Sequence, residues 1–263
     1  MAFNKNELIL DKVRSLTTHD LSNGEMLFRL TSLEEPSLSC TAEGEEVTDA
    51  IGAVITTLYR AKRATFSATN SLISLDLAAA QYGTKKEVGS EESMIEVPTY
   101  EIITIPADAT EVKLAHKPVD AKAIGFIYSI ANGETGTGYT AASTASATEF
   151  VIAEDGTITL PVGLTGKIFV EYSYETVNAN RVVNTASNFP EACSMKIYAY
   201  FRDKCNENLI YSGVIVAPKA KLNPEQVELA LTSTGKHAFE FTMMKDYCSE
   251  EGEDELFTII VAE

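Results

Sequence analysis

The three histidines, His19, His116 and His237, are the first side chains to consider for acid–base chemistry at neutral pH. They fall in three separate regions of the chain, and no serine or cysteine stands in a G-x-S-x-G context. Nucleophilic catalysis needs a base within hydrogen-bond reach of an activated nucleophile, and the spacing offers no such pair. We therefore expect each histidine in a loop or at a strand edge, and we predict no catalytic residue.

The four cysteines, Cys40, Cys193, Cys205 and Cys248, are widely scattered. They form no C-x-x-C pair, and no histidine lies near them at the spacing of a zinc site. Free thiols are therefore expected, and no metal ligand is predicted. A hairpin could bring Cys193 and Cys205 together as a disulfide, which a reducing compartment would disfavour.

Nucleotide and sugar chemistry find little support. Two Thr-Gly-Lys triplets, at 165–167 and 234–236, resemble the end of a P-loop, but Pro161 and Ala230 replace the upstream glycine and no Ser or Thr follows the lysine. Both triplets are expected to be hairpin turns, and no cofactor is predicted. Carboxylates are numerous enough for a glycosidase pair, although the chain has no tryptophan to line a sugar cleft. The sequence favours a protein that is not an enzyme.

The charge of the chain excludes another class. With 38 acidic and 21 basic residues the net charge is −17, whereas a nucleic-acid binder presents a basic face. Two acidic clusters, expected in solvated loops, contribute to this charge. They are Glu34, Glu35, Glu43, Glu45 and Glu46 in one, and Glu250, Glu251, Glu253, Asp254 and Glu255 in the other.

A chain of 263 residues with 45% hydrophobic residues can bury a substantial core. No apolar run approaches the roughly 20 residues that a membrane helix needs, so no membrane partner is expected. The first 15 residues carry charges among their apolar positions and resemble no secretory signal. We expect a protein made in a cytoplasm.

Residues 47–84 carry the strongest pattern. Apolar or small residues fill both alternating series of a strand, which predicts burial of both faces. Asn70 or Ser71 could cap a helix over Leu72–Ala80, and Gly83 could end it. The first series of the strand consists of Ile51, Ala53, Ile55, Thr57 and Tyr59, and the second of Gly52, Val54, Thr56 and Leu58.

This strand-to-helix segment, together with the strand order of residues 195–248, resembles the tail tube (major tail) proteins of tailed bacteriophages and related contractile particles. The resemblance implies a structural virion protein that forms hexameric rings, stacked into a tail tube through which DNA passes without specific binding. Its main partner would be itself, and sheath and tape-measure proteins would be further partners. An acidic lumen would repel phosphates and keep DNA moving.

The resemblance also assigns roles to residues. An early loop of tail tube proteins reaches the neighbouring ring, which makes the segment 34–46 the expected inter-ring contact; a mobile loop is the alternative. The strand from Ile51 to Tyr59 is expected in the ring barrel. The predicted helix would pack on the outside of that barrel.

The predicted fold is mainly β, a tail-tube-like sandwich or barrel with one short helix. Residues 1–92 and 176–263 would form a discontinuous tube core, and residues 93–175 an inserted sandwich-like module of short strands. Asp155-Gly156 predicts a hairpin turn, residues 132–147 a flexible loop, and Leu256–Val261 a strand inside the sheet. The alternative function is an adhesion or surface-binding module carried by the insertion.

Overall fold

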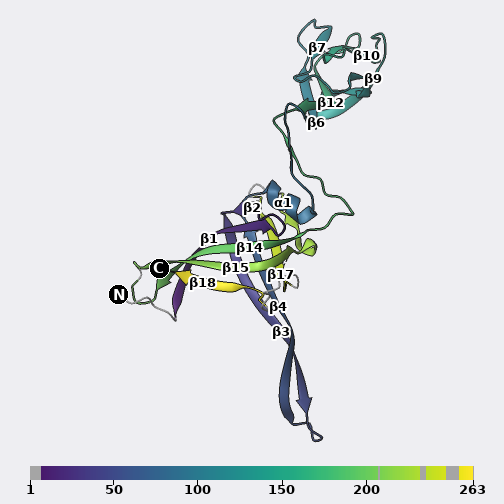
Figure 1. The fold of residues 1–263 in the computed structure, drawn as a ribbon. Coiled ribbons are helices and arrows are strands. Elements are labelled where there is room, and N and C mark those ends of the chain that lie inside the picture. The colour runs from purple at the N-terminus through teal and green to yellow at the C-terminus, as the bar shows by residue number, and fades with distance from the viewer. Residues whose placement is uncertain (1–6, 207, 232–234, 247–254, 263) are drawn as a thin grey trace. The chain divides into compact units, whose positions relative to one another are not determined.

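A computed structural model describes residues 7–206, 208–231, 235–246 and 255–262 of the chain (Figure 1). It forms two compact units, and one interrupts the other in the sequence. The core unit falls within residues 1–86 and 182–263, and the inserted unit comprises residues 87–181. Strands dominate both units, so the prediction of a mainly β fold is confirmed.

The core unit is one nine-stranded sheet with the order β2-β1-β14-β15-β17-β4-β3, to which β16 adds on β17 and β18 on β15. Every pairing in this sheet is antiparallel. The elements are β1 (Leu8–Asp20), β2 (Met26–Leu30), β3 (Leu33–Thr48), β4 (Val54–Asn70), α1 (Leu75–Tyr82), β14 (Ala192–Asp203), β15 (Ile210–Leu222), the 3-10 turn η2 (Pro224–Gln226), β16 (Glu228–Leu229), β17 (His237–Met243) and β18 (Thr258–Ala262).

This sheet curls into a half-barrel around its core. Phe28 of β2 stacks on Phe241 of β17 with ring centroids 6.5 Å apart. Four strand spacings separate β2 from β17, which is about 19 Å in a flat sheet, so the sheet must fold over itself. The enclosed residues are Leu16, Phe28, Leu30, Ala64, Phe66, Ala68, Leu77, Cys193, Met195, Ile197, Ala217, Ala220, Leu222, Phe239, Phe241 and Met243.

Helix α1 covers part of this core and begins later than predicted. Ser74 is its N-cap and accepts a hydrogen bond from the backbone N–H of Leu77 at 3.3 Å. The predicted cap at Asn70 is wrong because Asn70 still belongs to β4, where it pairs with Leu33 and His237. The predicted end is confirmed, since Gly83 adopts φ 65°, a left-handed conformation that favours glycine.

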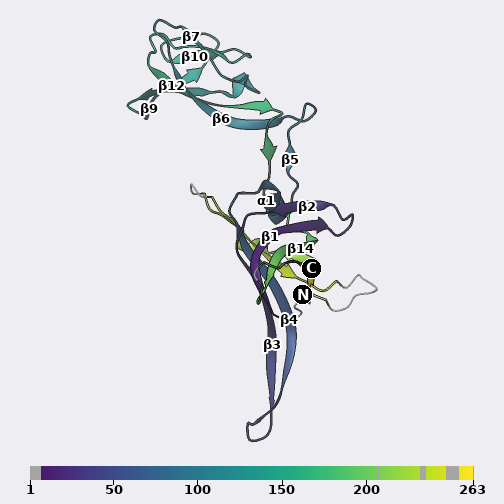
Figure 2. The same ribbon diagram turned by 90° about the vertical axis from the view of Figure 1, so that its left-hand side faces the viewer.

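The segment 34–46 is a strand, so its prediction as a loop is wrong. It forms most of β3, which pairs with β4 in a long hairpin that continues beyond the rest of the sheet (Figure 2). β-bulges accommodate residues whose types had suggested a loop. At one bulge two residues of β3, Glu35 (at φ 49°) and Pro36, lie opposite the single residue Ala68 of β4. Pro36 is tolerated because β3 is an edge strand and its missing N–H breaks no ladder bond.

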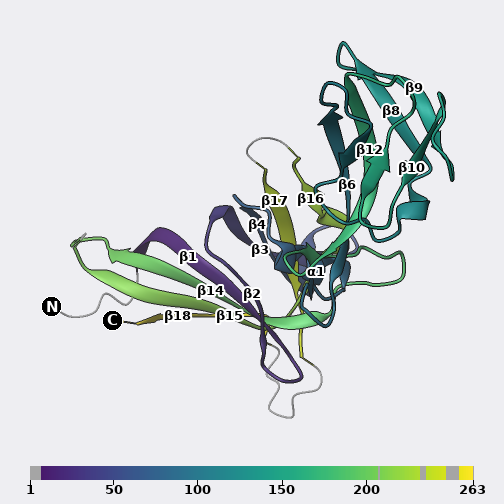
Figure 3. The same cartoon turned by 90° about the horizontal axis from the view of Figure 1, so that it is seen from above.

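The last strand also differs from its prediction. A strand is present, but β18 pairs with β15 alone among the described residues and so lies at an edge of the sheet. It occupies the first half of β15, from Ser212 to Val216, while β17 pairs with the end of β15. The strands β1, β14, β15 and β18 lie side by side there (Figure 3).

The inserted unit has its own sheets and its own core. Its seven-stranded sheet has the order β6-β12-β8-β9-β10-β11-β7, and β13 pairs with β5. Its core includes Phe150, Ile158 and Ile168. The elements are β5 (Glu87–Val88), β6 (Ile95–Thr104), β7 (Glu111–Lys113), the 3-10 turn η1 (Ala121–Ala123), β8 (Phe126–Ala131), β9 (Glu134–Ala141), β10 (Glu149–Ile152), β11 (Thr157–Thr159), β12 (Lys167–Thr176) and β13 (Asn180–Arg181).

Two turn predictions in this unit have different outcomes. Asp155-Gly156 does connect the antiparallel strands β10 and β11, with Gly156 at φ 85°. The flexible loop predicted at 132–147 is wrong in its first half, which forms β9 against β8. Gly138 lies opposite Tyr128, and a Cβ at Gly138 would stand only 3.0 Å from that ring. The small residues therefore make room for side chains of β8.

No helix among the described residues is long and apolar enough to cross a membrane.

Candidate assembly surfaces

The five glutamates of the predicted inter-ring segment separate into two groups along β3. Glu34 lies at the base of the hairpin, where Lys236 Nζ donates to its Oε2 at 2.5 Å and Ser71 Oγ to its Oε1 at 2.8 Å. These two hydrogen bonds lower the pKa of Glu34. Glu34 and the bulge residue Glu35 therefore belong to the sheet. The other three are Glu43, Glu45 and Glu46, which lie in the exposed far part of the hairpin.

This far part, residues 43–60, is called the distal hairpin below. Opposite pairs on its two strands are Glu43 with Arg60, Gly44 with Tyr59 and Glu45 with Leu58. Arg60 Nη2 lies 3.4 Å from Glu45 Oε2, an exposed ion pair that contributes little to stability. The hairpin therefore holds its shape by backbone pairing and by the packing of Tyr59 over Gly44, where a Cβ would approach the ring to 3.3 Å.

The predicted ring-barrel residues lie in the same hairpin, and within this single chain they are not buried. Ile51 and Ala53 belong to its turn, where both backbone N–H groups donate to Asp49 Oδ1. Ile55, Thr57 and Tyr59 follow in β4. In this single chain Ile51 is 89% exposed and Tyr59 is 75% exposed. The role of the five residues in a ring stays a prediction.

The distal hairpin exposes several apolar side chains, although its two strands pair with no other strand in the described part of the chain. Contiguous exposed apolar residues mark contact surfaces with other molecules. Ala64 is the first buried residue of β4, and Ile51 at the turn lies thirteen positions before it, so the hairpin reaches about 40 Å beyond the core. The exposed apolar residues are Val47, Ile51, Val54, Ile55, Leu58 and Tyr59.

The open edges of the curled sheet are a second candidate contact. β2 and β3 end the main strand order, and β18 ends its branch on β15. An edge strand offers unpaired N–H and C=O groups to another chain. Ile259 and Ile260 of β18 are half exposed beside that edge. The core unit can therefore extend its sheet by pairing with further copies.

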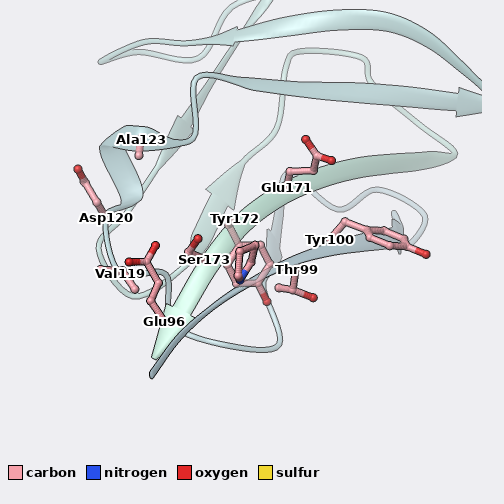
Figure 4. Close-up of a pocket in the computed structure, with 10 residues that line it drawn as sticks. Glu96, Thr99, Tyr100, Val119, Asp120, Ala123, Glu171, Tyr172 and Ser173 are labelled. Carbon is pink, nitrogen blue, oxygen red and sulfur yellow. The ribbon is translucent and has the colours of Figure 1, made fainter. Parts of the chain in front are cut away.

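The inserted unit carries a groove of about 530 Å³ (Figure 4). Tyr100 of β6 and Glu171 of β12 are paired across its floor, and Asp120 stands on its far side. Beside it Tyr172 donates to a Glu101 oxygen, and burial, with that hydrogen bond, raises the pKa of Tyr172 to about 12. Aromatic faces beside carboxylate acceptors suit ligands rich in hydroxyl groups.

The residues that could have done covalent or metal chemistry are not brought together. His237 is fully buried at the start of β17, so its expected place in a loop or at a strand edge is wrong. The expected free thiols are confirmed for Cys40, Cys193 and Cys205, and the alternative disulfide between Cys193 and Cys205 does not form. Cys248 and four members of the second acidic cluster, Glu250, Glu251, Glu253 and Asp254, lie outside the described residues, whereas Glu255 accepts a hydrogen bond from Thr258. Within the described ranges no three His, Cys, Asp or Glu side chains are grouped to hold a metal ion.

Comparison with known proteins agrees with this arrangement. No curated protein matches the chain. A model of the YomU/Tube protein family matches residues 8–253, which is nearly the whole chain and spans both the core unit and the inserted unit. The chain therefore belongs to the YomU/Tube protein family, a structural family that resembles phage tail tubes.

Proposed function

We propose that this protein is the repeating subunit of a phage or phage-like tail tube, in which hexameric rings stack into a hollow conduit. The observation that carries the proposal is the family match over residues 8–253. The protein would be assembled in the host cytoplasm and would reside in the virion tail. Sheath and tape-measure proteins would be its neighbours there.

The open sheet edges support ring closure. A curled sheet that ends in free edges can join the corresponding edge of the next copy, and six such joints would close a ring. Exposed Ile259 and Ile260 would be buried by the joint. Free edges expose a monomer to aggregation, so closure also protects the chain.

The distal hairpin supports stacking. It reaches about 40 Å beyond the core, which is enough to touch a subunit of the next ring. Glu43, Glu45 and Glu46 would make the polar part of that contact. The apolar residues of the ring-barrel prediction, Ile51, Ile55 and Tyr59, would be buried in it or in the ring wall.

The acidic balance supports passage of DNA without retention. A net charge of −17 repels phosphates at the surface of each subunit, and the charge accumulates as rings stack. DNA would therefore pass through the conduit without specific binding. No side chain needs to contact a base for this role.

Electron microscopy of the purified, concentrated protein tests the proposal. We expect hollow tubes or stacked rings of sixfold symmetry, before or after a mild heat or salt trigger. Uniform monomers under every condition, also when preformed tails are added as seeds, would refute it. Rings with a rotational symmetry other than sixfold would refute the proposed hexamer, but the proposal that the protein forms a tube would be kept.

The groove of the inserted unit supports a second function, adhesion to a cell or virion surface. The unit has its own core, and its groove is lined by Tyr100 and by the carboxylates of Glu96, Asp120 and Glu171. We expect fluorescent tubes to bind host cells and variants with Tyr100→Ala and Glu171→Ala to bind less. Equal binding by both would remove this second function and leave the tube proposal unchanged.

A further inference from the structure

A basic and aromatic face lies on the core unit, on the side of β1, β2 and β14 that points away from the core. Along β14, Met195 and Ile197 are buried, so Lys196 and Tyr198 project from the opposite side of the sheet. Thr17 pairs with Lys196 on one side and with Arg29 of β2 on the other. Three residues in one row of adjacent strands thus place two cations beside a threonine.

Two further cations, Lys12 and Arg14, extend the face toward the start of β1. Lys12 Nζ lies 5.9 Å from the centre of the Tyr200 ring, and Arg14 Cζ lies 5.6 Å from it. The basic face is defined as Lys12, Arg14, Arg29 and Lys196 with Tyr198 and Tyr200. Among the described residues none of its four cations forms a salt bridge, and the carboxylate of Asp11, next to Lys12 in the sequence, is engaged by Arg202.

The centre of this face lacks a partner. Thr17 is more than nine-tenths buried between Arg29 and Lys196, and its Oγ1 has no hydrogen-bond partner among the described residues. A buried hydroxyl without a partner is costly, and an arriving anion would accept its hydrogen. Within the part of the chain that the structure describes, these four cations form no salt bridge, which is a second departure in a chain of net charge −17.

The distal hairpin carries the complementary surface. The distal hairpin contains four carboxylates, Glu43, Glu45, Glu46 and Asp49, and one cation, Arg60, which forms an exposed ion pair with Glu45. Apolar residues alternate with these acids. The basic face has a similar mixture, because it includes exposed Tyr198, and Ile260 of β18 lies in the same row of strands as Tyr198, with Val214 between them. Nucleic acid would match the cations but not these apolar side chains, and the net charge would repel it.

The distal hairpin does not pair with the strands of the basic face in its own chain. It continues beyond the rest of the sheet (Figure 2), and its two strands pair only with each other among the described residues. The two surfaces are different patches, so a contact between them is heterologous and repeats from copy to copy. Such a contact propagates a stack rather than closing a dimer.

We propose that the acidic distal hairpin of one copy docks on the basic face of a copy in the next ring. Carboxylates of Glu43, Glu45 and Glu46 meet Lys12, Arg29 and Lys196, and the hydroxyl of Thr17 donates to one of them. This contact rests on the proposed tube function and assigns both of its surfaces.

Charge reversal on each surface tests the contact. A hairpin variant carries Glu43→Lys, Glu45→Lys and Glu46→Lys, and a face variant carries Lys12→Glu, Arg29→Glu and Lys196→Glu. Each alone should associate more than about tenfold more weakly than the unmodified protein, because like charges then meet in every contact. An equimolar mixture should assemble, since each hairpin again meets a face of opposite charge. Circular dichroism of each variant controls for folding, and sedimentation velocity measures association.

The outcomes separate the inference from the proposed function. Assembly of either variant alone at the normal level, or no association in the mixture, overturns the docking contact. If the docking contact is overturned but the unmodified protein forms tubes, the proposed tube function is kept. If the unmodified protein forms no tubes, the tube function is refuted, and the mixture of variants still shows whether hairpin and face bind each other. A last outcome would assign the basic face to nucleic acid and overturn the inference. In that outcome the unmodified protein and the hairpin variant bind a DNA duplex, the face variant does not, and the mixture of variants fails to assemble.

Discussion

The imidazole of His237 and the side-chain amide of Gln81 join β17 to α1 through a buried hydrogen bond. His237 Nε2 lies 2.5 Å from Gln81 Oε1, and Nδ1 accepts from the backbone N–H of Ser74 at 3.4 Å. Because Nδ1 accepts, the ring hydrogen is assigned to Nε2 and the ring is neutral. Both side chains are buried, at 0% and 2% exposure, and Gln81 also donates to Ala238 O. The neutral imidazole of His237 therefore connects helix α1 to strand β17.

This ring makes stability depend on pH. Burial lowers the pKa of His237 to about 4, below the value of about 6.5 in an unfolded chain. The unfolded state therefore binds the proton first, so the free energy of unfolding falls as pH drops from about 6.5 to about 4 and levels off below. Between about pH 7 and about pH 4.5 we expect this ring to account for about 2 kcal/mol of the loss.

Urea unfolding of the protein and of His237→Gln at both pH values measures this effect. The carboxylates titrate alike in both proteins, so the difference between their pH slopes isolates the imidazole. Parallel slopes would contradict a neutral buried ring.

Gly83 fixes the end of α1 against the segment that leads into β14. Its φ is 65°, and a Cβ there would lie 2.1 Å from the carbonyl oxygen of Phe189. We expect Gly83→Ala to reduce the free energy of unfolding by about 3 kcal/mol, from backbone strain and from the displaced Phe189. Gly24→Ala is the matched control, since φ is 73° but the space is empty; it should cost about 1 kcal/mol. Equal losses in urea unfolding would show that the contact with Phe189 is unimportant.

Local chemistry made part of the fold predictable from the sequence. The end of α1 followed from a glycine suited to a left-handed cap, and the β10–β11 turn from Asp155-Gly156. The start of α1 did not follow, because the backbone of Asn70 is committed to pairing with His237, which is 167 residues away. Whether Asn70 caps a helix or pairs with a distant strand is decided by tertiary structure, so the residues around Asn70 in the sequence do not reveal it.

The candidate contacts show a similar limit. Alternation of apolar residues from Ile51 to Tyr59 indicated burial, but a period-two pattern cannot say whether the covering surface belongs to the same chain. The basic face was invisible for another reason. Arg29 and Lys196 meet only because both strands pair with Thr17, and no spacing in the sequence reports that register.

The cysteines should differ sharply in reactivity. Burial raises the pKa of the Cys193 thiol to about 12, whereas Cys40 and Cys205 are exposed. In a Cys248→Ser background we expect two thiols of the native protein to react quickly with a disulfide reagent and the third only in denaturant. Cys193→Ser should then abolish the slow class alone. Rapid reaction of three thiols in the native state would contradict the burial of Cys193.

Removal of the distal hairpin should separate folding from assembly. Replacing residues 44–59 by Asn-Gly joins Glu43 to Arg60, which already face each other, through a two-residue turn. The removed residues contribute nothing to the buried core, so the melting temperature should change by less than about 4 °C. Electron microscopy should show no stacked tubes. Tubes of normal length would contradict a stacking role for the hairpin, and a large loss of melting temperature would show a role in folding.

Removal of the inserted unit is the corresponding test of the second compact part. Arg181 pairs with Glu87 and donates to its carboxylate at 2.9 Å, so the chain enters and leaves the unit at neighbouring points. Joining Lys86 to Val182 through a short Gly-Ser linker should leave the core unit folded, because the two hydrophobic clusters share no residue. Thermal melting followed by electron microscopy measures the result, and tubes of reduced outer diameter or mass per length are expected.

The isolated fragment 87–181 should melt cooperatively on its own. A core unit that fails to fold while the fragment folds would show that the core depends on its insertion, and a folded core that forms no tubes would place an assembly contact on the inserted unit.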